Sequence, residues 1–292
     1  QSDYTGNRDK LNIPRPPKKI SDKKPDLYQW NNDGWIANIK NIHISNGIFN
    51  NEKENSLTEL LGNRFYGEHI IFSNITGDLK NVHFEKDTLT TDINLSSKER
   101  SGFEVKKLEA AFKFTPQMME FNKLNLLTNK SRLGNYYAMR YKEFSDMNSF
   151  LHRVTLEGNF ENSELSSDDL AFFAPELRSW KRTFSIKGNA NGTIDNFTAK
   201  RMIIKSGNTS IDGDIALSGL PDINNTFIDF TSRDLATSYN DLVSIIPSLK
   251  NITQPQLSKL GNIRYKGNFT GFISDFVAYG TINTNLGVVK GD

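Results

Sequence analysis

Histidines and paired carboxylates are the residues whose chemistry could serve a metal ion or a reaction. The histidines are scattered, at His43, His69, His83 and His152. None has a metal-ligand spacing to another histidine or to a carboxylate. Asp168 and Asp169 are adjacent, but they stand in the first turn of a predicted helix. There the positive end of the helix dipole stabilises their negative charges, which explains the pair without a catalytic role. We therefore expect no metal site and no cofactor.

Other catalytic signatures are also missing from the sequence. It contains no Walker A loop and no dinucleotide-binding glycine fingerprint. The absence of cysteine excludes disulfides, zinc–cysteine sites and a cysteine nucleophile. A net charge of +2 gives no field that favours nucleic acid. We expect a protein that is not an enzyme, although a glycosidase remains an alternative, since its two acids need not be neighbours.

The clearest pattern is a repeated unit. Lys187-Gly-Asn-Ala-Asn-Gly-Thr-Ile-Asp-Asn-Phe197 and Lys266-Gly-Asn-Phe-Thr-Gly-Phe-Ile-Ser-Asp-Phe276 share Lys-Gly-Asn-x-x-Gly-x-Ile-x-x-Phe, with a partial echo at Thr76–Val82. Apolar residues alternate with polar ones on both sides of a short polar turn, which predicts an antiparallel hairpin. Glycine inside a strand is tolerated where a sheet bends or another backbone packs closely. Each unit is therefore one hairpin of a long, curved sheet.

The apolar inventory is thin for a chain of this length. Hydrophobic residues make up 36% of the 292 residues, and 24% are charged. Such a composition suits a sheet with one apolar and one polar face rather than a thick layered core. No stretch approaches the roughly 18 apolar residues of a membrane span, and no signal peptide is recognisable.

Strands and short helices can be placed along the chain. Residues 1–34 form a basic, proline-rich lead-in, predicted to be a solvated linker or an arm that touches anionic lipid. Residues 35–292 form the β region, which we interpret as a fragment of a longer protein because it stops within a strand pattern. Asn46-Gly47 predicts a hairpin turn. Strands are expected at residues 69–75, 77–84, 88–95, 103–114, 121–127, 183–190, 192–197, 200–205, 209–217, 226–230 and from 261 onward. Helical segments are expected at residues 57–61, 141–150, 166–174 and 238–246.

The strand alternation selects a set of side chains for one apolar face. With about 15 strands at roughly 4.8 Å spacing, this face would be about 70 Å long. Few helices and no second sheet are expected to cover it, so a sheet folded over on itself, with the apolar side chains facing a groove, fits best. The expected lining residues are Leu108, Ala110, Phe112, Phe114, Leu124, Leu126, Phe184, Ile186, Ala190, Ile194, Ile211, Ile215, Leu217, Ile228, Phe230, Phe269 and Ile273.

Several stretches resemble the TamB family, within the wider AsmA-like group. The stretches that carry this resemblance are Ile93–Phe103 with its Lys-Glu-x-Ser-Gly-Phe run, Ser163–Pro175, Leu217–Ile223, Tyr265–Phe276 and Gly280–Gly287. Together they extend over most of residues 35–292, and the chain looks like a middle segment of such a protein.

The resemblance implies a fold and a role. The fold is mainly β: a long antiparallel sheet curled into a half-pipe (a β-taco), with two or three short inserted helices. The implied role is phospholipid transport across the periplasm between inner and outer membrane, in support of outer-membrane biogenesis. Acyl chains would be the ligand and an Omp85-family barrel the partner. The inner-membrane anchor and the barrel contact would lie outside this chain. Two other readings stay open: a polysaccharide-binding β protein, and a structural, adhesin-like segment.

Overall fold

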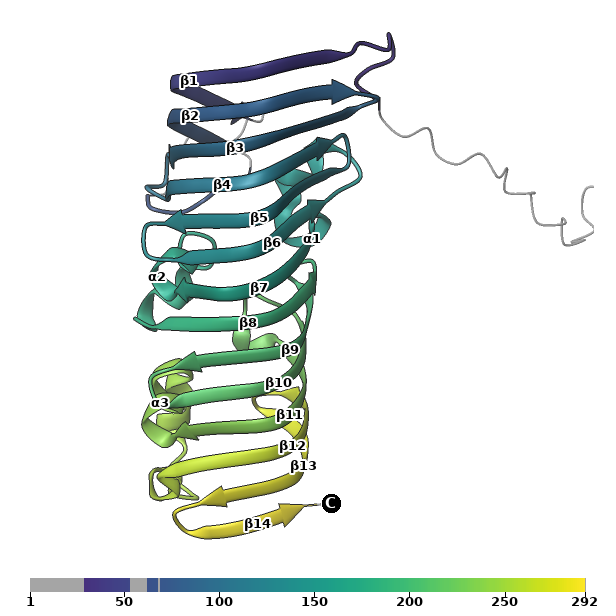
Figure 1. The fold of residues 1–292 in the computed structure, drawn as a ribbon. Helices are drawn as coiled ribbons and strands as arrows, with labels where there is room; N and C mark the ends of the chain where they lie inside the picture. The colour runs from purple at the N-terminus through teal and green to yellow at the C-terminus, as the bar shows by residue number, and fades with distance from the viewer. Residues whose placement is uncertain (1–28, 53–61, 68, 292) are drawn as a thin grey trace, which may run out of the picture.

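A single antiparallel sheet forms the molecule. The computed structural model describes residues 29–52, 62–67 and 69–291. Within them, 14 strands are hydrogen-bonded in sequence order, β1 to β14, as a meander (Figure 1). The strands are β1 Ala37–Glu52, β2 His69–Glu85, β3 Thr88–Glu99, β4 Glu104–Thr115, β5 Met118–Thr128, β6 Arg132–Arg140, β7 Thr155–Ser166, β8 Thr183–Gly192, β9 Asn196–Ser206, β10 Thr209–Ser218, β11 Phe227–Ser238, β12 Asn262–Phe272, β13 Asp275–Thr284 and β14 Gly287–Gly291.

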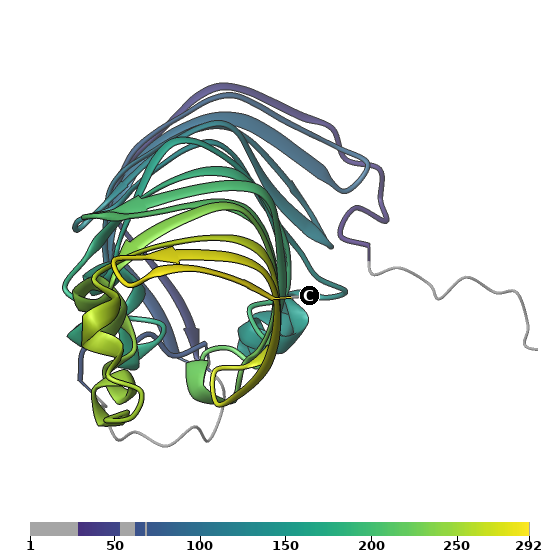
Figure 2. The ribbon, with the colours of Figure 1, turned by 90° about the horizontal axis from the view of Figure 1, so that it is seen from below.

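The sheet is curled into an open half-pipe, as the view along its axis shows (Figure 2). In a meander, alternate connections lie at opposite ends of the strands. We call the end that carries α2 (Ser167–Leu170) and α3 (Tyr239–Ile245) the α2 rim. The other end carries the 3₁₀ helix η2 (Phe144–Ser149) and α1 (Phe150–Arg153), and we call it the α1 rim. The remaining 3₁₀ turns are η3 Pro175–Ser179, η4 Ile223–Asn225, η5 Pro247–Asn251 and η6 Leu257–Leu260.

Bulges within the strands accompany the curl. Register shifts interrupt most of the strand pairs. Non-glycine residues with positive φ lie at or beside many of them: Asn46, Asn74, Asn81, Lys123, Asn135, Asn162 and Arg201. An inserted residue bends its strand and increases the local twist. Asparagine tolerates the left-handed region better than most residues, which explains its frequency here.

The glycines of the repeated unit allow close backbone approach. Gly267 has φ of 152°, and a Cβ there would lie 1.9 Å from the carbonyl oxygen of Tyr279 on β13. Gly188, its counterpart in the first repeat, has φ of 137°, and a Cβ would lie 2.7 Å from the carbonyl oxygen of Arg201. Both copies form hairpins, β8–β9 and β12–β13. Glycine recurs in the unit because any side chain would collide with the neighbouring strand.

The predicted fold class is confirmed: the protein is mainly β, with one antiparallel sheet that does not close into a barrel. Individual predictions need correction. Asn46-Gly47 is a bulge inside the continuous strand β1, not a hairpin turn, because the left-handed Asn46 is accommodated without reversing the chain. Segments 69–75 and 77–84 are one strand, β2, bent at bulges. Residues 193–195 form the β8–β9 turn rather than part of a strand. Strands β6 and β7 were not predicted.

The inserted helices occur where expected, although they are short. Ser166 caps α2 by accepting a hydrogen bond from the Asp168 amide, and Ser238 caps α3 through the Asp241 amide. The α2 helix lies between β7 and β8, in the middle of the strand order. The predicted helix at 57–61 and residues 1–28 of the lead-in lie outside the described residues.

A substitution at a bulge tests its role in the curl. Asn162 on β7 is exposed and has φ of 47°. Asn162→Val should lower the free energy of unfolding by about 1–2 kcal/mol, because a side chain branched at Cβ is strained in the left-handed region. Asn162→Gly is the control and should change it by less than about 1 kcal/mol. Urea denaturation followed by circular dichroism measures both. Equal stability of the Val and Gly variants would contradict this role.

Candidate functional site

One continuous row of side chains crosses ten strands on a single face of the sheet. Each member lies directly opposite the next in register, from β4 to β13. Residues directly opposite in an antiparallel pair project to the same face. At roughly 4.8 Å per strand, this central row is about 43 Å long. Its members are Phe112, Phe121, Tyr137, Gly158, Ala190, Ala199, Ile215, Phe230, Phe269 and Ala278.

Two further rows flank the central row on the same face. The row nearer the α1 rim contains Phe114, Met119, Met139, Leu156, Gly192, Phe197, Leu217, Ile228, Gly271 and Phe276. The row nearer the α2 rim contains Leu95, Leu108, Leu126 and Leu133, and then Ile186, Ile204, Ile211, Leu235, Tyr265 and Ile282. The three rows make one apolar surface, which we call the apolar face.

Aromatic rings support one another along the apolar face. Phe112 lies 4.9 Å from Phe121 between ring centroids, and Phe121 lies 6.3 Å from Tyr137. Burial raises the pKa of the Tyr137 phenol, because its surroundings penalise the phenolate. Near the other end, Phe269 stacks on Phe276 at 4.7 Å. Side chains of the sheet thus pack laterally against their cross-strand neighbours.

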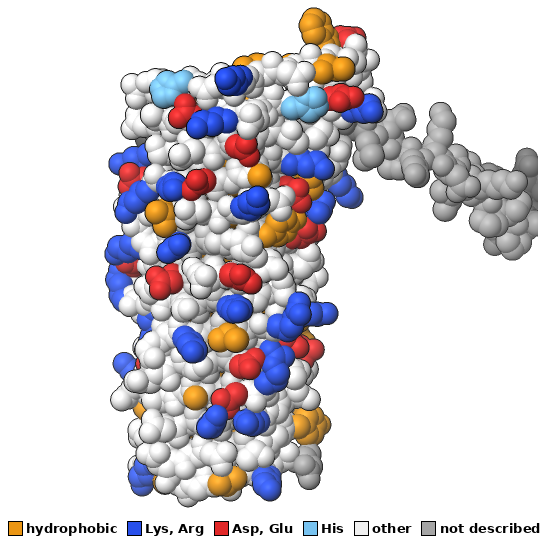
Figure 3. Space-filling model, viewed as in Figure 1, with side chains coloured by type: hydrophobic (Ala, Val, Ile, Leu, Met, Phe, Trp, Pro, Cys, Tyr) orange, Lys and Arg blue, Asp and Glu red, His pale blue; other side chains and the backbone are white. Residues whose placement is uncertain are grey.

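Charged residues dominate the opposite face. Figure 3 shows the convex side of the molecule with Lys, Arg, Asp and Glu spread over it and few apolar side chains. Its ion pairs run between neighbouring strands, as in Arg140–Glu157 and Arg264–Asp234. The Arg140 guanidinium lowers the pKa of the Glu157 carboxyl. The apolar face is therefore the concave one, and the convex face is solvated.

The apolar face is not fully covered by protein. Phe112, Phe121 and Ile215 remain half-buried, although they are large and central. Exposure increases toward the last strands, where Phe276 is 53% and Val289 is 65% exposed. A filled core of a layered protein would bury such side chains almost completely.

Connections at the two rims cover the margins of the apolar face near β4–β8. Met147 and Val154, from the β6–β7 connection, pack beside Phe114 and Met139. On the α2 rim, Phe173 packs against Phe103, with ring centroids 5.4 Å apart. The open side of the half-pipe lies between the two rims, and we call it the mouth. These helical connections line it.

Residues 62–67 run across the mouth and contact the β7–β8 connection on the α2 rim and the β6–β7 connection on the α1 rim. The Phe65 amide donates to the Phe172 carbonyl in the β7–β8 connection over 2.8 Å. Gly67 approaches the β6–β7 connection so closely that a Cβ would lie 2.7 Å from the Met147 carbonyl oxygen. A cavity of about 310 Å³ lies between this segment, residues 148–152 and Phe173. The mouth is therefore bridged here.

The structure places most of the expected lining residues on the apolar face. Phe112, Ala190, Ile215, Phe230 and Phe269 lie in the central row. Phe114, Leu217, Ile228, Leu108, Leu126, Ile186 and Ile211 lie in the flanking rows. Ala110 and Leu124 are buried in one cluster with Ile93. Phe184 packs with the Ile186 cluster.

Two expected lining residues are elsewhere. Ile194 and Ile273 occupy corresponding places in the two repeats, and both lie in the hairpin turns β8–β9 and β12–β13. The strands end one or two residues earlier than alternation alone indicates. Sequence reasoning also missed Phe121, Tyr137, Met139, Ala199 and Phe197, mostly because bulges change the alternation and β6 went unrecognised. The positive-φ asparagines are the signal that could have located the bulges.

The described residues contain no group of three or more His, Asp or Glu side chains that could hold a metal ion. His152 Nδ1 lies 2.6 Å from Asp195 Oδ2, and this contact lowers the pKa of the Asp195 carboxyl. No helix within the described segments is long and apolar enough to cross a membrane.

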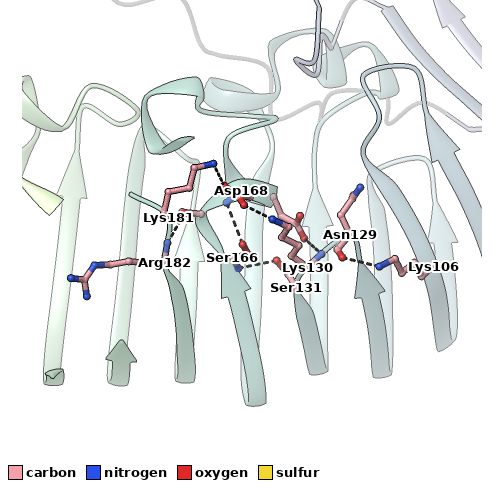
Figure 4. A network of polar contacts seen from close by, with 10 residues as sticks. Lys106, Asn129, Lys130, Ser131, Ser166, Asp168, Lys181 and Arg182 are labelled. Atoms are coloured by element: carbon pink, nitrogen blue, oxygen red, sulfur yellow. Dashed lines mark hydrogen bonds and ion pairs between the residues drawn. The ribbon is translucent and has the colours of Figure 1, made fainter. Parts of the chain in front are cut away.

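A polar network orders the α2 rim (Figure 4). Buried Asp169 accepts hydrogen bonds from the Thr128 hydroxyl at 2.5 Å and from the Lys130 amide at 3.0 Å. The half-buried carboxylate of the neighbouring Asp168 contacts Lys130 Nζ at 2.6 Å and Lys181 Nζ at 2.9 Å. This network ties the β5–β6 turn to α2 and to the start of β8.

A second contact joins the β7–β8 connection to α3. Arg182 Nη2 lies 2.5 Å from Asp241 Oδ1, and these side chains are only 17% and 11% exposed. The hydrogen bond from Arg182 is the main cause that lowers the pKa of the Asp241 carboxyl. Asp241 also accepts from the hydroxyl of Ser238, the residue that caps α3. This ion pair fixes α3 on the rim.

Fold and site together define a class of architecture: an open half-pipe made from one antiparallel sheet, with a continuous apolar concave face. Comparisons of the chain with protein-family models, curated proteins and solved structures give no match.

Removing the buried ion pair at α3 should destabilise the protein in a pH-dependent way. Asp241→Asn should cost about 3 kcal/mol at pH 7, because it leaves the largely buried Arg182 guanidinium without its counter-ion. The folded pKa of Asp241 is lowered, so its stabilisation is present above the unfolded pKa of about 4 and is lost as pH falls through the folded pKa. The gap between wild type and variant should therefore narrow below about pH 4.

Thermal unfolding from pH 3 to pH 7 measures this gap. The control is Asp275→Asn, at the exposed start of β13. A gap that is constant over this pH range would show that the ion pair does not stabilise α3.

Proposed function

We propose that this protein binds acyl chains along its apolar face and serves as a conduit for phospholipid. The observation that carries the proposal is the unbroken central row, which keeps one face apolar across ten strands while its large side chains, Phe230 apart, stay half-buried. An ordinary core would be covered by a second layer. A binding surface for a flexible apolar chain needs length, continuity and access, and this face has all three.

The cost of exposing acyl chains to water favours their transport along a groove lined with apolar side chains. Exposing one CH₂ group to water costs about 0.8 kcal/mol, so a sixteen-carbon chain costs on the order of 12 kcal/mol. That cost makes spontaneous passage of a lipid through water slow. A continuous apolar face removes most of it, while the head group stays in solvent. The convex face, with its ion pairs, keeps the half-pipe hydrated.

The resemblance to the TamB family supports a cellular location for this activity. We propose a periplasmic protein, anchored to the inner membrane through a segment outside this chain. It would deliver phospholipid toward the outer membrane and support outer-membrane biogenesis and protein assembly. An Omp85-family barrel would be reached through other regions. No side chain is assigned a catalytic role in this proposal, because binding and sliding of an acyl chain need no bond to break.

A charge placed in the central row tests the proposal. Ile215→Asp on β10 puts a carboxylate between Ala199 and Phe230, in the path of an acyl chain. It should lower co-purified phospholipid, measured by native mass spectrometry, by about tenfold or more, since an unpaired charge on an apolar surface is strongly disfavoured. The matched control, Ala216→Asp, puts the same charge on the convex face of the same strand and should retain the lipid.

Circular dichroism must show both variants folded. A folded Ile215→Asp protein that still carries wild-type amounts of lipid would refute the groove. Wild-type protein that carries no lipid but binds oligosaccharide would favour the polysaccharide reading instead. Protein that binds neither ligand would favour a structural, adhesin-like segment.

A further inference from the structure

The two rims of the half-pipe differ in charge. The described side chains in connections at the α2 rim include Arg64, Arg100, Lys130, Arg178, Lys181, Arg182, Lys250 and Lys259, against Asp168, Asp169 and Asp241. Those at the α1 rim contain Lys86, Lys142 and Arg153, against Asp87, Glu143, Asp146, Asp195 and Asp222. Basic residues thus outnumber acidic ones at the α2 rim, and acidic residues outnumber basic ones at the α1 rim.

Two acidic side chains of the α2 rim point away from solvent, while several of its basic side chains are exposed. Asp169 and Asp241 are buried, and Asp241 is neutralised by Arg182. Asp168 faces two ammonium groups, those of Lys130 and Lys181, which are 61% and 67% exposed. The carboxylates of Asp168 and buried Asp169 balance the two lysines in number, but the exposed ammonium groups are the charges that this point of the rim presents to solvent (Figure 4).

These two ammonium groups stand on the rim that borders the apolar face. Lys130 follows Leu126, a member of the row nearer the α2 rim, by four residues, which span at most about 13 Å of chain. Lys181 precedes Phe184 by three residues. A molecule with an apolar tail and an anionic group can therefore contact both features at once.

We propose that the α2 rim is the track for phosphate-bearing head groups: lipids lie across the half-pipe with acyl chains on the apolar face and phosphate beside Lys130 and Lys181. The inference rests on the proposed function and adds the chemical class and the orientation of the ligand. The opposite orientation would place phosphate beside the acidic α1 rim, where Asp195 and Asp222 repel it. Lipids would then move in a single orientation along the conduit.

Neutralising the two rim lysines separates head-group recognition from acyl binding. The test uses the double variant Lys130→Gln/Lys181→Gln. The control, Lys187→Gln/Lys200→Gln, removes the same charge from exposed lysines on β8 and β9. Each protein is titrated with fluorescent phosphatidylglycerol and with diacylglycerol of identical chains, and its thermal unfolding is recorded.

The rim variant should bind phosphatidylglycerol about tenfold more weakly, the loss expected for two lysines beside an anionic head group. Its affinity for diacylglycerol, and the affinity of the control variant for both lipids, should stay within about twofold. Higher salt should reduce the difference, because exposed charges are screened.

Other outcomes overturn the inference in distinguishable ways. If the folded rim variant binds both lipids like wild type, the groove stands and the head-group track is wrong. If it loses both lipids equally, the lysines act through rim structure and not through phosphate. If inorganic phosphate alone binds the wild type as tightly as phosphatidylglycerol does, the rim is a site for free anions. Wild-type protein that binds neither lipid would overturn the proposed function and the track together.

Discussion

The structure depends on one constraint: successive strands must keep their apolar side chains in register on the same face. A slip of one residue turns every side chain of a strand to the opposite face. Here the rows persist across bulged strands, because a bulge on one strand is absorbed locally, as between Phe160 and Ser163 on β7. Continuity of register, rather than burial in a thick core, gives this sheet its apolar face.

Bulges and glycines set the shape that makes this face concave. Left-handed asparagines such as Asn81 and Asn162 lie at bulges, which bend the strands. Glycines such as Gly188 and Gly267 let backbones approach at places where any Cβ would collide. The resulting curl gathers the apolar side chains inward and spreads the charged ones outward. Local backbone conformations of modest energetic cost thus give the sheet an apolar concave face and a charged convex face.

The rims complete the architecture. Meander connectivity sends alternate connections to opposite ends of the strands, so each rim can evolve its own charge and its own short helices. Capped turns such as α2 and α3 are too short to be stable alone. They are held by contacts with neighbouring connections, above all the Arg182–Asp241 pair and the network around Asp169. An apolar face bordered by rims of unlike charge suits a ligand with an apolar tail and a charged head.

The sequence by itself determined the fold class, the repeated hairpin and most members of the apolar face. Alternation is a local signal, and residues such as Phe112, Ile215 and Phe269 carry it plainly. Tertiary structure decided what alternation cannot encode. Asn46-Gly47 became a bulge, Ile194 and Ile273 fell into turns, and Phe121 and Tyr137 joined the central row through cross-strand pairings whose register depends on bulges. The charge difference between the rims likewise arises only when connections far apart in sequence are brought to the same end of the strands.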